Sequence, residues 1–85
     1  MQSSSVLRWR KTTDINRENP LFELLNGEVL LLDVGFNDAG DFEISFNPGV
    51  VGKLFEWQQF IKLLEEGKAL ADRDFSGSAD FEKID

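Results

Sequence analysis

The chain has 85 residues, enough for one small domain whose core draws on eight Phe and two Trp. It has no cysteine and no histidine, which excludes disulfides, thiolate metal sites, the usual zinc ligand sets and every catalytic triad or pair built on those residues. The formal net charge of −7 is uneven: residues 1–17 hold four basic residues and one acidic residue (net +3), and the rest holds five basic and fifteen acidic residues (net −10). An acidic body repels phosphate backbones, so the charge disfavours the binding of nucleic acid. It either favours a basic protein partner or serves solubility.

The two ends of the chain are polar or rich in Gly and Ser, and we expect residues 1–5 and 76–85 to be flexible parts of a single domain. The first residues do not have the pattern of a secretory signal peptide. The longest apolar run, residues 29–32, is far shorter than the roughly 20 residues of a membrane span. We therefore expect a soluble, cytoplasmic protein that does not enter membranes, and the absence of cysteine agrees with a reducing compartment.

The first half of the chain has the pattern of strands. Residues 6–13 predict an edge strand whose basic residues discourage pairing with another chain. Its Trp9 is expected to pack inward. Whether this strand joins the sheet stays open. Residues 14–20 predict a loop. Two apolar runs then flank Asn26-Gly27, a pair that supplies the two positive φ angles of a type I′ turn, so the sequence predicts a hairpin with these two residues as its loop.

A second hairpin is predicted around "FNDAGDFEISF", residues 36–46, because apolar and polar residues alternate there. A three-residue loop with Gly40 in the left-handed position sets apolar residues opposite one another: Phe36 with Phe42, Val34 with Ile44, and Leu32 with Phe46. A four-residue loop would set Phe42 opposite Gly35, so the three-residue loop is favoured.

This register predicts a polar outer face at one end of the sheet, comprising Asp33, Gly35, Asn37, Asp41, Glu43 and Ser45. Farther along, Val29 and Leu31 share the outward direction, and the first hairpin brings Phe22 and Leu24 beside them. The sequence therefore predicts an outer face that is acidic at one end and apolar at the other. The apolar end is covered either by the N-terminal segment, which we favour, or by a partner.

From residue 54 to residue 72 the spacing becomes helical. One stripe comprises Trp57, Phe60, Ile61, Leu64, Lys68 and Ala71, with Leu63 and Leu70 flanking it. Gly67 either ends this helix or weakens it from inside by about 1 kcal/mol. The stripe should pack over Phe36, Phe42, Ile44 and Phe46. The predicted fold class is α+β: a small antiparallel β-meander of three to four strands packed on one C-terminal α-helix.

Several residue groups hint at chemistry, and in each case a structural role is the better account. Asp33, Asp41 and Glu43 could hold a hard cation or act as an acid–base pair, but the alternation of the hairpin already explains them. "NDAGD" lacks the ligand spacing of a calcium loop. "LRWRK" offers one aromatic ring and three cations, which is too little for a single-stranded nucleic-acid groove. We predict no enzyme activity, no metal and no cofactor.

With the hairpins and helix placed, "ENPLFELLNGEVLLLDVGFNDAGDFEISF" and "EWQQFIKLLEEGKALAD", roughly residues 18–72, resemble the small acidic α+β immunity proteins of bacterial toxin systems. The resemblance lies in the apolar strand pair, the acidic outer face and the short helix. It implies one-to-one inhibition of a toxin domain, often basic, and it transfers no individual inhibitory residue.

The leading hypothesis is a non-enzymatic protein-binding domain that engages a basic partner through the outer sheet face. Asp33, Asp41 and Glu43 would supply charge, and Asn37 and Ser45 would supply hydrogen bonds. Glu65 and Glu66 on the helix form a second candidate surface. The alternative is a structural or assembly subunit that self-associates through the apolar patch, and a metal-dependent carboxylate enzyme is a third possibility. We expect a monomer or a weak homodimer.

Overall fold

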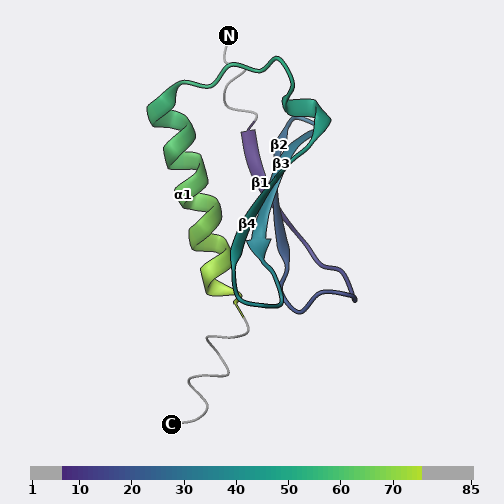
Figure 1. The fold of residues 1–85 in the computed structure, drawn as a ribbon. Helices are drawn as coiled ribbons and strands as arrows, with labels where there is room; N and C mark the ends of the chain where they lie inside the picture. Colours follow the sequence, from purple (N-terminus) through teal and green to yellow (C-terminus); the bar gives the residue numbers. More distant parts are fainter. Residues whose placement is uncertain (1–6, 76–85) are drawn as a thin grey trace.

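A computed structural model describes residues 7–75, which form one antiparallel sheet and one helix (Figure 1). The strand order is β1-β2-β3-β4, and α1 lies across one face of the sheet. The elements, in chain order, are β1 (Leu7–Thr12), β2 (Leu21–Asn26), β3 (Val29–Phe36), β4 (Phe42–Phe46), the 3₁₀ turn η2 (Pro48–Val50) and α1 (Trp57–Arg73). The predicted α+β meander packed on a C-terminal helix is confirmed. The expected flexible segments, 1–5 and 76–85, lie outside the described residues.

The N-terminal strand belongs to the sheet as an edge strand. β1 pairs antiparallel with β2, with Trp9 opposite Leu24. The Trp9 ring packs against α1, where its atoms lie directly over Gly67. The prediction that Trp9 points inward is therefore confirmed. Because neighbouring residues of a strand point to opposite faces, Arg8 and Arg10 point away from the helix.

The turn between β2 and β3 differs from the predicted one. Asn26 pairs with Val29, so Gly27 and Glu28 form the loop instead of Asn26 and Gly27. Only Gly27 has a positive φ angle (62°), which fits a type II′ turn and not the type I′ turn that needs two such residues. Asn26 remains in the strand because one left-handed residue is sufficient to reverse the chain.

A β-bulge in β3 decides which residues of β2 face the helix. Leu25 pairs with Leu30 but Leu24 pairs with Leu32, so Leu31 is an extra residue in β3. Without the bulge, the pairing from the turn would set Phe22 opposite Asp33, on the outer face. The bulge moves Phe22 opposite Val34 instead, on the side of the helix.

The prediction of an apolar patch on the outer face is therefore wrong. Phe22, Leu24 and Leu31 are buried in the core that packs against α1, and Val29 is half exposed. The expected cover was the N-terminal segment, whereas the helix provides it. Phe22, Leu24 and Leu31 are 4%, 0% and 0% exposed, so they offer almost no surface for self-association.

The β3–β4 hairpin has the predicted register. Phe36 pairs with Phe42, Val34 with Ile44, and Leu32 with Phe46. Gly40 has a φ angle of 92°, and its N–H donates to the carbonyl of Asn37 at 3.0 Å, as expected for the left-handed position of a three-residue loop.

The helix begins three residues later than predicted and continues through Gly67 to Arg73. Glu56 is the N-cap, and its carboxylate accepts a hydrogen bond from the Gln59 N–H at 2.9 Å. Gly67 lies inside the helix and does not end it. A glycine is needed at this position because the Trp9 ring occupies the space that a side chain would fill.

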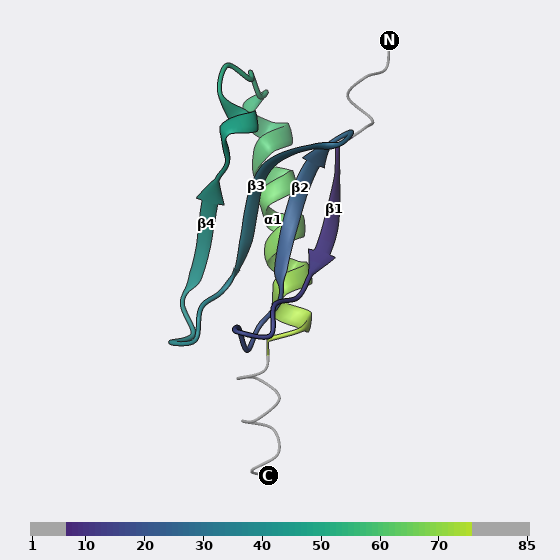
Figure 2. The ribbon, with the colours of Figure 1, turned by 90° about the vertical axis from the view of Figure 1, so that its right-hand side faces the viewer.

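The face that α1 buries is rotated from the predicted stripe. Its core contacts come from Phe60, Leu63, Leu70 and Ala71, while Trp57 is 69% exposed. Figure 2 shows α1 behind β2 and β3, with β4 at one edge of the sheet and β1 at the other. As a result Ile44 and Phe46 remain 40% and 60% exposed, contrary to the expectation that the helix covers them.

Candidate functional site

The five residues predicted to bind a partner lie together on the outer face of the β3–β4 hairpin, the face away from α1. The register pairs Asp33 with Ser45 and places Glu43 opposite Gly35. Phe36 and Phe42, their neighbours along the strands, point toward Lys68 of the helix, so the alternation of the strands turns the polar set outward. We call this set the acidic face; it consists of Asp33, Asn37, Asp41, Glu43 and Ser45.

The Asn37 side chain forms hydrogen bonds within the hairpin itself. Its Oδ1 accepts hydrogen bonds from the backbone N–H groups of Ala39 and Asp41, both at 2.9 Å. Its Nδ2 donates to Glu43 Oε2 at 2.8 Å. Asn37 therefore holds the loop and orients the Glu43 carboxylate, which differs from the predicted role as an adaptable group for a partner.

The remaining members differ in their accessibility. Asp41, Glu43 and Ser45 are exposed, whereas Asp33 is half buried and accepts a hydrogen bond from Asn47 Nδ2 at 3.4 Å. The most accessible carboxylates of the acidic face are therefore Asp41 and Glu43, at the β4 edge of the described sheet.

The outer face has a basic side and an acidic side. On the β1 side, Arg10 donates through Nε and Nη2 to Glu23 Oε1, at 2.9 and 2.6 Å. The other ion pairs between described residues are Lys11–Asp74 and Lys68–Asp72. None of the three involves a carboxylate of the acidic face. Within residues 7–75, the charges of Asp33, Asp41 and Glu43 are thus not neutralised by a neighbouring cation.

Two further carboxylates that sequence reasoning did not place lie at the same end of the sheet. The backbone nitrogen of Glu18 lies 3.5 Å from Asp38 Oδ1, so the loop after β1 approaches the β3–β4 turn. Both residues are exposed. No local sequence signal joins positions 20 residues apart, and only the strand order reveals that the two loops meet.

The second candidate surface, Glu65 and Glu66, lies on the exposed side of α1. Glu66 also borders a shallow apolar hollow with Trp9 and Leu70. These two carboxylates follow each other along a helix, so they point in different directions and form no flat surface comparable to the acidic face.

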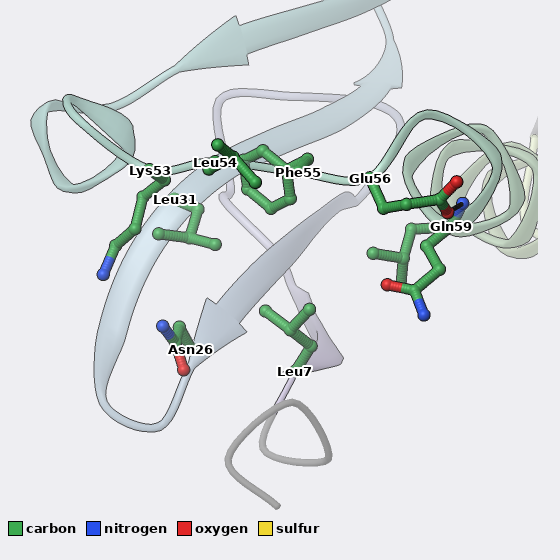
Figure 3. A pocket seen from close by; sticks show the side chains of 9 residues that line it. Leu7, Asn26, Leu31, Lys53, Leu54, Phe55, Glu56 and Gln59 are labelled. Atoms are coloured by element: carbon green, nitrogen blue, oxygen red, sulfur yellow. Dashed lines mark hydrogen bonds between the residues drawn. The ribbon is translucent and has the colours of Figure 1, made fainter.

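A pocket of about 210 Å³ opens between the ends of the strands and the segment that precedes α1 (Figure 3). Leu7, Asn26 and Leu31 line it from the sheet, facing Phe55. Its ionisable groups are Lys53 and Glu56, and Glu56 is already used as the helix cap.

No cluster of three or more metal-ligating side chains occurs within residues 7–75. In the same part of the chain, the helix lacks the length and apolar character needed to cross a membrane. Comparison of the sequence and structure with protein-family models, curated proteins and solved structures found no match.

Proposed function

We propose that this domain is a non-enzymatic, cytoplasmic protein-binding module that engages a basic protein partner through the acidic face. The observation that carries the proposal is the set of carboxylates at Asp33, Asp41 and Glu43, which share one sheet face and have no ion pair with any other residue of the described part. Like charges held close together repel one another, so a cationic partner gains free energy by neutralising them.

The rigidity of the hairpin supports the same proposal. The Asn37 side chain ties the loop to Asp41 and to the Glu43 carboxylate. A preorganised charged surface loses little conformational entropy when it binds. Such a surface fits the inhibitory, immunity-type role that the sequence resemblance implies, in which an acidic domain covers the basic active-site region of a toxin.

The test uses a lysine-rich peptide as a defined basic probe and follows the backbone amides of the full chain by NMR. We expect peptide-induced shifts to concentrate at Asp33, Asp41 and Glu43. The affinity should fall steeply as salt is added, because exposed charges are screened over about 10 Å at 0.1 M ionic strength.

Two charge-matched variants identify the surface. Asp41→Lys/Glu43→Lys reverses two carboxylates of the acidic face, and Glu65→Lys/Glu66→Lys makes the same change in net charge on the helix. The proposal requires that the first variant abolish peptide binding while the second leaves most of it. Equal losses in both variants would mean that only net charge matters, and the acidic face would then have no specific role.

A further inference from the structure

Along the outer edge of β4, the backbone hydrogen-bonding groups have no partner strand within residues 7–75. The N–H of Asn37 donates to the Asp41 carbonyl and the N–H of Asn47 donates to the Leu31 carbonyl, both at 2.9 Å. These bonds bracket the β3–β4 pairing, so the alternation of an antiparallel ladder turns the backbone groups of Glu43 and Ser45 toward β3. The N–H and C=O groups of Phe42, Ile44 and Phe46 point to the opposite edge, where no strand of residues 7–75 pairs with them.

The side chains of the same strand leave apolar surface beside this edge. Ile44 and Phe46 point to the helix side of the sheet, yet they remain 40% and 60% exposed. Figure 2 shows β4 at one margin of the sheet. An exposed edge strand with apolar side chains is a template for another strand.

The two edges of the sheet are not equivalent. β1 carries Arg8, Arg10 and Lys11, charges that discourage pairing. If two copies of β1 paired antiparallel about Trp9, Arg8 would lie opposite Arg10 of the second copy. Within β4 the only charge is Glu43, so β4 is the edge open to association.

The sequence of β4 is nearly the same in both directions, which favours a second copy of the chain as the occupant of the edge. "FEISF" centred on Ile44 reads Phe-Glu-Ile-Ser-Phe forward and Phe-Ser-Ile-Glu-Phe in reverse. In a two-fold antiparallel pair about Ile44, Phe42 lies opposite Phe46 of the second copy and Ile44 lies opposite Ile44. Glu43 meets Ser45, so no carboxylate faces another carboxylate. In the same register Asp41 lies opposite the amide of Asn47.

We propose that two copies of this chain associate through their β4 strands, joining the two sheets into one continuous sheet. Antiparallel pairing about Ile44 needs hydrogen-bonded pairs at Phe42, Ile44 and Phe46, and these are the residues whose backbone groups point outward. The two-fold axis is perpendicular to the sheet, so both helices lie on one face and both acidic faces lie on the other. Dimer formation therefore leaves the acidic face accessible.

The size of the contact predicts a weak dimer. A single five-residue strand buries less than the roughly 1,200 Å² at which stable protein interfaces begin. Association should therefore depend on protein concentration. Added salt should not weaken it, because the bonds are between uncharged backbone groups and the subunits carry like net charge.

Amide hydrogen exchange of the full chain, measured by NMR over about a hundredfold range of concentration, tests the proposal. We expect the amides of Phe42, Ile44 and Phe46 to exchange at least about tenfold more slowly at the highest concentration than at the lowest. The amides of Glu43 and Ser45 are bonded to β3 in both states and should change little. Sedimentation in parallel should show the average mass rising over the same range.

Two neighbouring lysine substitutions serve as a matched pair. Ile44→Lys sets two cations opposite each other across the axis and should abolish the rise in mass. Ser45→Lys adds the same charge one residue away, where it faces Glu43 of the second copy, and should preserve the dimer. Thermal unfolding checks that both variants fold. The exchange pattern of the unmodified chain remains decisive even if Ile44→Lys does not fold.

Three results would overturn the proposal. If the three outward amides exchange rapidly at every concentration, the edge binds no second copy. If they are protected to the same degree at every concentration, the chain covers its own edge. If Ser45→Lys abolishes association as fully as Ile44→Lys does, the register about Ile44 is wrong.

Discussion

The indole ring of Trp9 lies so close to Gly67 that a Cβ atom at position 67 would come within 2.7 Å of both Cη2 and Cζ2. This contact joins the edge strand β1 to the middle of α1. It explains a glycine in a helix interior, and it sets how closely the helix approaches the sheet.

Gly67→Ala should therefore destabilise the protein, although alanine is favoured over glycine in a helix by about 1 kcal/mol. We expect the free energy of unfolding in urea to fall by about 1–3 kcal/mol, as for other overpacked contacts. Combining the change with Trp9→Leu should remove most of the loss. If Gly67→Ala stabilised the chain, the ring could not occupy the position described.

Asn37→Ala should lower the free energy of unfolding by about 1–2 kcal/mol, because two backbone N–H groups lose the side-chain oxygen that accepts from them. Asp38→Ala, at the next position in the exposed loop, should change it by less than about 0.5 kcal/mol. Urea unfolding of both variants measures the difference. A loss below about 0.5 kcal/mol for Asn37→Ala would show that the Asn37 bonds contribute little.

The bulge predicts losses of very different size at two positions of β3, Leu31 and Val29. Leu31 is fully buried, so Leu31→Ala should cost about 2–5 kcal/mol of unfolding free energy. Val29 is 47% exposed, and Val29→Ala should cost less than about 1 kcal/mol. Comparable losses measured by chemical denaturation would mean that the two side chains share one environment, and the bulge would be absent.

The cap of α1 can be tested by Glu56→Ala, which removes the carboxylate that accepts from the Gln59 N–H. We expect a loss of about 0.5–2 kcal/mol in unfolding free energy. Glu56→Asp keeps a carboxylate of the type preferred at helix starts and should retain or increase stability. Thermal unfolding of the two variants separates capping from a simple change of charge.

The β3–β4 hairpin was predictable because its apolar and polar residues alternate strictly, so only one register pairs Phe36 with Phe42. The β2–β3 hairpin was not, because Leu30, Leu31 and Leu32 are chemically alike and give no signal for the extra residue. The rotation of the helix was also not predictable, because it depends on the Trp9–Gly67 contact between distant parts of the chain.

For the candidate site, alternation predicted that the five residues share one face. It did not reveal that Asn37 is used by its own loop, because side-chain hydrogen bonds have no periodic signature in a sequence. Nor did it show that Arg10, on the β1 side of the outer face, is paired to Glu23.

The alternation of hydrogen bonds along β4 has a consequence for how this strand tolerates mutation. The side chains of Glu43 and Ser45 lie on the outer face of the sheet, and their backbone groups bond to β3. The Ile44 side chain lies on the helix side, and its backbone groups point to the outer edge of the sheet. If both proposals hold, substituting Glu43 or Ser45 should alter charge recognition, whereas substituting Ile44 should alter strand association. Deleting a single residue within this segment would then shift the register and disturb both at once.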